Sequence, residues 1–108
     1  MSFSVGLLYS TQDFLNLLSV SPLKASEFPK VFFNIYGVAS SKLILQTSIQ
    51  TQWVTLDLND RLLLTSKGKE ILQAKNYDER LRIQILHLIM IEKNQPGHQL
   101  YTMVDLKR

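Results

Sequence analysis

The segment WVTLDLNDRLLLTSKGKEIL, residues 53–72, carries the strongest structural signals in the chain. Its apolar residues at positions 54, 56 and 58 alternate with Trp, Thr and Asp, and this period of two predicts a half-buried strand. Asn59 and Asp60 both tolerate a positive φ and predict a tight turn. Residues 61–65 then form the second strand, so a β-hairpin is expected over residues 53–65.

A helix is expected directly after this hairpin. Thr65 or Ser66 is suited to its N-cap, and Gly68 would let the helix pack closely against a neighbour. The helical pattern either continues from Ser66 into the next apolar run or breaks near Asn76, where acidic residues suit a new first turn.

Two helices are expected in the N-terminal part of the chain, up to Gly37. Residues 2–9 alternate loosely and predict a short strand or a packed arm, after which the capping signal STQD at residues 10–13 starts a helix that ends near Val20. Ser26 is the N-cap expected for the second helix, which has proline in its first turn and stops at Gly37.

The third helix is expected from about Ser41 to Gln50, after a connection of residues 38–40. A strand over residues 42–50 is the alternative, because Thr, Ile and Gln fill this segment. As a helix, the segment buries Leu43, Ile44 and Thr47. Its outward side chains are then Ser41, Lys42, Gln46 and Gln50.

The last helical run, from about Tyr77 to Glu92, is apolar nearly all round at its end. Such a helix needs more burial than a small domain offers, so a partner surface is expected. We expect this surface to include Leu81, Ile85, Leu88 and Ile89. Residues 1–93 would then form one domain, and residues 94–108 a short strand or tail.

Composition points to a single soluble domain. The chain has 108 residues, of which 45% are hydrophobic and 19% charged, and a chain of this length buries roughly 65% of its unfolded surface. It has no cysteine, no signal-peptide pattern and no long apolar run, so we expect a cytoplasmic protein without a membrane span. The chain could also be a fragment or a module of something longer.

The net charge of +3 favours a polyanionic partner only weakly, because the basic residues are spread along the chain. No catalytic pattern is present. His87 sits among apolar residues and is expected to be packed, His98 stands alone, and Asp57 and Asp60 fit a turn better than a metal site. We therefore expect no enzymatic activity, no metal and no cofactor.

The run LTSKGKEIL, residues 64–72, following the hairpin from Trp53 to Thr65, resembles the winged helix-turn-helix superfamily. The resemblance implies an α+β, mostly α fold with three N-terminal helices, a two-stranded wing and a long C-terminal helix. It also implies that the third helix enters the major groove of DNA and that the wing touches the backbone. The DNA contacts it suggests are Ser41, Lys42, Gln46, Gln50, Arg61, Lys67 and Lys69.

Two functions follow as hypotheses. The first is a DNA-binding regulator, or a module of a larger DNA-associated protein, that binds duplex DNA and dimerises through its C-terminal helix. The second is an adaptor with the same fold that binds a protein through that helix and no nucleic acid. The even distribution of charge along the chain favours the adaptor, while the habits of the superfamily favour DNA binding. Asp57 and Asp60 beside Arg61 give the wing a local negative balance, which argues against a grip on DNA phosphates.

Overall fold

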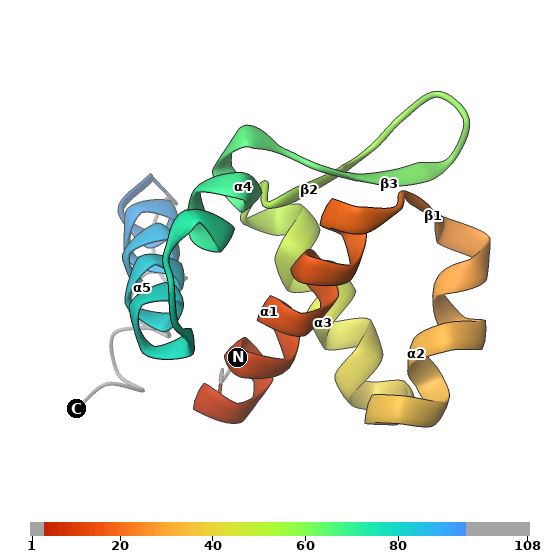
Figure 1. Ribbon diagram of the computed structural model, residues 1–108, viewed down its shortest axis with the longest axis horizontal. Helices are drawn as coiled ribbons and strands as arrows, with labels where there is room; N and C mark the ends of the chain where they lie inside the picture. The colour runs from red at the N-terminus through yellow and green to blue at the C-terminus, as the bar shows by residue number, and fades with distance from the viewer. Residues whose placement is uncertain (1–3, 95–108) are drawn as a thin grey trace.

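The computed structural model of the chain describes residues 4–94 and is α+β, mostly helical, as expected (Figure 1). This part of the chain contains five α-helices and a small antiparallel sheet. The elements in chain order are α1 (Val5–Val20), β1 (Leu23–Lys24), the 3₁₀ helix η1 (Ala25–Glu27), α2 (Phe28–Tyr36), α3 (Val38–Gln50), β2 (Val54–Leu56), β3 (Arg61–Leu64), α4 (Ser66–Gln73) and α5 (Tyr77–Asn94).

Helix α1 begins earlier than its capping signal predicts. Ser4 is the N-cap, and its hydroxyl accepts the N–H of Leu7 at 3.0 Å. The expected strand or arm over residues 2–9 is therefore wrong for residues 5–9, which are helical. Thr11, within the expected cap, instead lies inside the helix and donates its hydroxyl to the carbonyl of Leu7. The predicted end at Val20 is confirmed.

Helices α2 and α3 meet at Gly37, as expected, but without the three-residue connection. Gly37 has φ 85°, a left-handed value that glycine adopts at little cost, and Val38 already belongs to α3. The helical interpretation of residues 42–50 is confirmed and the strand alternative is wrong. Phe28 and Phe32 of α2 stack on each other and pack edge-on against Phe14 of α1.

The sheet has three strands in the order β1-β3-β2, one more than expected. In the predicted hairpin, β2 pairs antiparallel with β3, and Asp60 takes a φ of 61° in the turn. The added strand β1 pairs Leu23 with Leu62. The expected burial of one strand face is wrong beyond residue 54, because Leu56 and Leu58 are exposed.

Helices α4 and α5 are separate, which settles the choice between a continuous and a broken helix. Ala74 is extended and ends α4, and Asn76 accepts the N–H of Glu79 to start the next helix. Arg80 donates to the carbonyls of Leu72 and Ala74, so it satisfies the free end of α4. These bonds tie the first turn of α5 to the end of α4.

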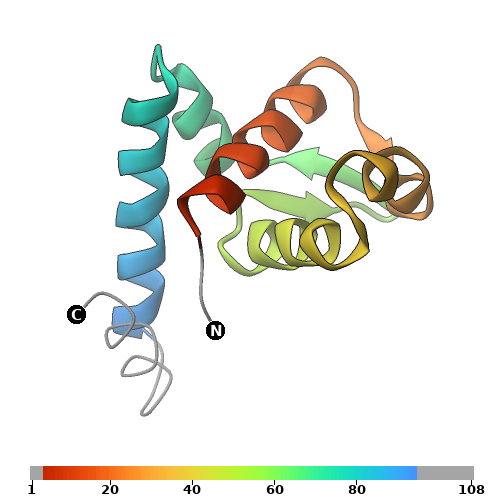
Figure 2. The same ribbon diagram turned by 90° about the horizontal axis from the view of Figure 1, so that it is seen from below.

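Helix α5 packs on α1 through a buried polar bridge. Gln84 donates to the carbonyl of Leu8 at 3.0 Å and accepts from Gln12 at 2.8 Å, and both glutamines are fully buried. Figure 2 shows the C-terminal half of α5 extending past α1. The predicted tail of residues 94–108 lies, except for Asn94, outside the described residues.

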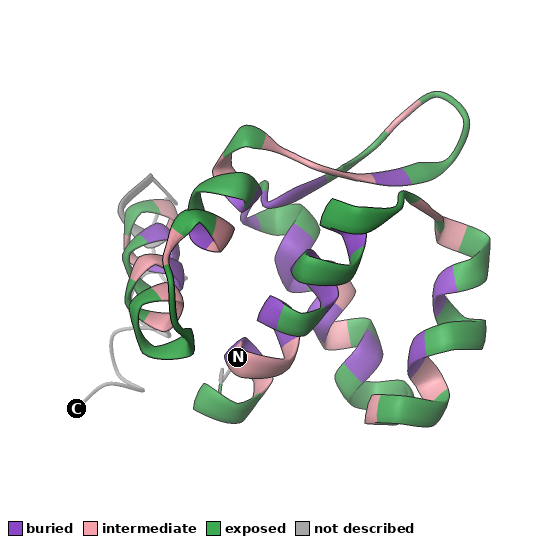
Figure 3. Ribbon diagram, in the orientation of Figure 1, coloured by how far each residue is buried: buried purple, intermediate pink, exposed green. Residues whose placement is uncertain are grey.

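The core lies between the helices and the inner face of the sheet, where buried positions line up in Figure 3. Its largest fully buried side chains are Trp53 and Phe14. Gly68 packs so tightly that a Cβ there would lie 2.3 Å from the carbonyl oxygen of Trp53. The close packing predicted for this glycine is therefore confirmed. No helix within residues 4–94 is both long and apolar enough to cross a membrane.

Candidate functional site

The outward face of α3 carries three of the expected contact residues. Lys42, Gln46 and Gln50 are all exposed, and their four-residue spacing places them within about 80° of one another around the helix. Ile49 lies on the same side of the helix and is also exposed. None of these three polar side chains forms a hydrogen bond or ion pair with the described residues. This face is therefore free to contact a partner.

Ser41 does not belong to this face, and its predicted outward position is wrong. Its side chain is fully buried, and its hydroxyl donates to the carbonyl of Phe32 at 2.9 Å. Because α3 begins at Val38 directly after the turn, Ser41 lies in the first turn, where the helix packs against α2. Ser41 ties the two helices together and is not available to a ligand.

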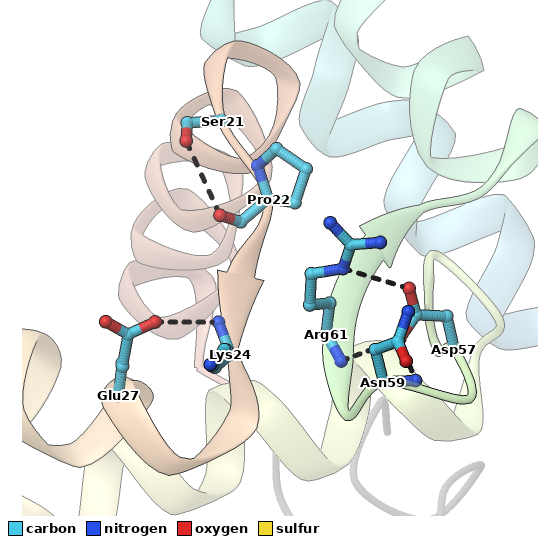
Figure 4. A network of polar contacts seen from close by, with 7 residues as sticks. All are labelled: Ser21, Pro22, Lys24, Glu27, Asp57, Asn59 and Arg61. Carbon is cyan, nitrogen blue, oxygen red and sulfur yellow. Dashed lines mark hydrogen bonds and ion pairs between the residues drawn. The ribbon is translucent and has the colours of Figure 1, made fainter.

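Arg61, at the start of β3, is engaged inside the hairpin. Its Nε lies 3.1 Å from Oδ2 of Asp57, and the backbone N–H groups of Arg61 and Asn59 both donate to Oδ1 of the same carboxylate (Figure 4). The hydrogen bond from the Arg61 backbone is the largest cause that lowers the pKa of Asp57. The carboxylate therefore stays charged and partly neutralises Arg61.

Lys24 adds a cation at the hairpin that the sequence did not indicate. The register of β1 places Lys24 opposite Arg61, and the two residues lie on neighbouring strands in Figure 4. Lys24 is exposed, and its backbone N–H donates to Glu27. A two-residue strand has no hydrophobic period, so only the structure could place this lysine beside the hairpin.

Lys67 and Lys69 lie in the first turn of α4 but line different grooves. Lys67 lines a groove of about 700 Å³ between α4, β2 and the end of α3, together with Ile49, Gln52 and Thr55. Lys69 lines another groove, beside Asn16 and Ser19 at the end of α1. The structure thus joins Lys67 to the α3 face and separates Lys69 from it.

The apolar surface of α5 differs in part from the expected one. Leu88 is buried and joins the core, so its expected role in an interface is wrong, while Leu81 and Ile89 are half-buried. Ile85 is exposed, as the interface requires. Leu86 and Met90, which were not in the expected set, are 54% and 56% exposed. We call Ile85, Leu86, Ile89 and Met90 the outer face of α5.

His87 is packed inside the protein, as its apolar neighbours predicted. Its Nδ1 accepts the indole N–H of Trp53 at 2.8 Å, and its Nε2 lies 3.6 Å from a carboxylate oxygen of Glu70. Burial lowers the pKa of His87, while the charge of Glu70 raises it and Lys67 lowers it further. The contact between Glu70 and His87 could not be predicted from the sequence, because Glu70 belongs to α4 and His87 to α5.

A shallow hollow lies where the start of α5 meets α1 and is lined by Tyr9, Asp13, Asn76, Tyr77 and Asp78. The Tyr9 hydroxyl donates to Asp78 at 2.6 Å, and this bond is the main cause that raises the pKa of Tyr9. Among the residues that the structure describes, no group of three or more histidine, aspartate or glutamate side chains gathers as a metal site would require.

No protein-family model matches the chain, and neither a curated protein nor a solved structure resembles it significantly.

Proposed function

We propose that the chain is a winged-helix module that binds duplex DNA through the outward face of α3 and self-associates through α5. The observation that carries the proposal is the face of Lys42, Gln46 and Gln50, which is exposed and makes no described bond within the chain. Two helices joined at a glycine, followed by a hairpin, are the order of elements that the resemblance implies. In that arrangement α3 is the reading helix.

The side chains of this face suit the major groove. Glutamine forms two hydrogen bonds with the edge of adenine, so Gln46 and Gln50 are the candidates for base reading. Ile49 supplies an apolar surface for a thymine methyl group. Lys42 would neutralise a phosphate, and Lys67 would neutralise another beside the end of α3.

A single chain offers few contacts to DNA and would bind weakly. For this reason self-association is part of the same proposal. Two phosphate contacts per chain predict a slope of about −2 for log affinity against log salt, which is a weak interaction. A dimer doubles the contacts and reads two half-sites. The outer face of α5 offers apolar side chains at positions 85, 86, 89 and 90, a spacing that forms one continuous stripe for a second copy.

DNA binding is tested by a salt titration of a fluorescent duplex with Lys42→Glu and a charge-matched control, Lys75→Glu. Lys75 is exposed in the connection between α4 and α5. We expect Lys42→Glu to weaken binding at least tenfold at low salt and to reduce the salt slope by about 1. The control should weaken it only slightly. Equal losses for both variants, or no binding at low salt, would reject α3 as the reading helix.

Self-association is tested separately, by sedimentation of the full chain and of Leu86→Glu. Ile35→Glu is the control, because Ile35 is an exposed apolar residue on α2. We expect the first variant to be monomeric and the control to remain dimeric. Leu88→Glu is unsuitable, because Leu88 is buried in the core and a charge there would unfold the chain.

The exposure of Leu86 and Met90 also favours a second candidate, an adaptor that binds a protein through α5 and no DNA. The Asp57 carboxylate beside Arg61 favours the same reading, because it reduces the positive charge at the hairpin. The two functions separate cleanly. A chain that self-associates in the Leu86-dependent manner but binds no duplex at low salt would be an adaptor.

A further inference from the structure

The contact between Trp53 and His87 connects helix α5 to the rest of the fold through a titratable group. Trp53 and His87 are both buried, and the indole N–H donates to Nδ1 of the imidazole at 2.8 Å. A nitrogen that accepts a hydrogen bond carries no proton, so the ring holds its proton on Nε2. That side of the ring faces Glu70 of α4, whose carboxylate oxygen is 3.6 Å away.

Trp53 occupies the point where the other elements meet. Its backbone N–H donates to Ser48 of α3, and its carbonyl accepts the N–H of Thr65, the N-cap of α4. Its carbonyl is also the atom against which Gly68 packs. A change in the position of this residue therefore reaches α3, the hairpin and α4 together.

We propose that protonation of His87 breaks its hydrogen bond with the Trp53 indole and lets the imidazolium bind the Glu70 carboxylate instead. The attachment of α5 to the hairpin then depends on pH. A protonated imidazole has N–H groups on both nitrogens and no acceptor. The N–H of Nδ1 would then face the N–H of the indole, and their hydrogen bond is lost. The imidazolium gains a charge-assisted bond to the Glu70 carboxylate instead.

The surroundings of His87 set the direction of this response. Burial holds its pKa below the ordinary value near 6.5, Glu70 opposes this shift, and Lys67 adds to it. Both charged groups lie on α4. The groups that α1 contributes near α5, Tyr9 and Asp13, lie at the far end of the helix beside Tyr77.

The sign of the effect on stability follows from the lowered pKa. The unfolded chain takes up the proton more readily than the folded chain, so the stabilisation from neutral His87 is complete above the unfolded value near 6.5. It is lost as the pH falls from there through the lower folded pKa. In the folded protein the switch therefore operates in mild acid.

The single tryptophan of the chain gives a direct readout. We expect the one indole N–H resonance of Trp53, followed by NMR, to shift in a single transition centred below the ordinary histidine pKa, while far-UV circular dichroism stays constant. His87→Gln, whose amide oxygen can accept the indole N–H without titrating, should abolish the transition. His98→Gln, which removes the only other histidine, should leave it unchanged.

Glu70→Gln tests the second half of the switch and does not alter the buried pair. Loss of the carboxylate should move the midpoint to lower pH, because Glu70 favours the protonated ring. Lys69→Gln, which removes an exposed charge on the same helix, should not move it. The proposal is overturned if the transition persists in His87→Gln, if the indole resonance stays constant in mild acid, or if it changes only when the whole chain unfolds. None of these measurements depends on DNA binding.

Discussion

Trp53 and Leu58 belong to the same predicted hairpin, yet Trp53 is 0% exposed and Leu58 is 104% exposed. At the base of the hairpin, Trp53 is bonded to α3, α4 and α5. At the tip, the Asp57 carboxylate accepts the backbone N–H groups of Asn59 and Arg61, and the carbonyl of Asp60 accepts the N–H of Ala25 in η1 at 2.8 Å. The base thus connects three helices, whereas the tip is held by its own turn and by the neighbouring η1.

Among the substitutions at the base of the hairpin, Gly68→Ala should give the largest loss of stability, because it disturbs the packing against Trp53 directly. The added Cβ would lie 2.3 Å from the carbonyl oxygen of Trp53, a backbone atom held by other bonds. Overpacking at such a site costs about 3 kcal/mol, which exceeds the gain of about 1 kcal/mol from better helix propensity. Urea denaturation measures the difference.

Gly6→Ala is the matched control for that substitution. Gly6 is also helical, and its nearest neighbour would lie 3.9 Å from the added Cβ, an ordinary contact. This variant should be neutral or more stable by about 0.5–1 kcal/mol. If Gly68→Ala were equally harmless, the contact with Trp53 would not hold α4 to the base.

Thr65→Ala should cost less, about 1–2 kcal/mol. The hydroxyl accepts the N–H of Gly68 at 3.0 Å and shares its proton between the carbonyls of Gln52 at 2.5 Å and Trp53 at 3.0 Å, so it caps α4 and ties it to the segment between α3 and β2. Thr65→Ser keeps these bonds and should lose less than half as much in urea denaturation. A serine variant as unstable as the alanine variant would assign the effect to the lost methyl group.

The base was largely predictable because its signals are local. Thr65 caps the next helix through a neighbour three residues on, and Gly68 marks a close approach, so each feature could be inferred from a short window. Gly37 ends α2 for the same kind of reason. The positions of these residues in the fold then followed from the order of elements.

Features that depend on distant contacts could not be predicted. Strand β1 is two residues long and gains its pairing only from β3, so Lys24 gave no signal of lying beside Arg61. Likewise, Glu70 and Trp53 contact His87 from other elements of the fold.

The start of α1 is a local feature that was also missed. Ser4 caps the helix without the acidic residue that makes a capping box recognisable.

The α3 face was half predictable, because helical spacing gives only relative orientation. It placed Lys42, Gln46 and Gln50 together, and the structure agrees. Ser41 was assigned to the wrong side although the helical period places it about 180° from Gln50, on the side of Ile44 and Ser48, which are buried. On that side its hydroxyl donates to the carbonyl of Phe32 in α2, a partner that no local pattern reports.

Asp57 should control the tip without affecting the base. Asp57→Ala removes the acceptor of the N–H groups of Asn59 and Arg61, so their amide hydrogens should exchange faster while those of α3 do not. Asp57→Asn keeps an acceptor and should show a smaller change. Because the pKa of Asp57 is lowered, its bonds persist above the unfolded value near 3.9 and are lost as the pH falls through the folded value.

Leu58→Ala should have the smallest effect, within about 0.5 kcal/mol in urea denaturation, because the side chain is fully exposed. Leu62→Ala is the internal control: Leu62 lies in the same hairpin but is fully buried, and its truncation should cost about 3 kcal/mol. A comparable loss for both would mean that the tip contributes to the core. With stability unchanged, any loss of DNA affinity or self-association in Leu58→Ala would report a direct contact of the tip with a partner, because the fold behind it is intact.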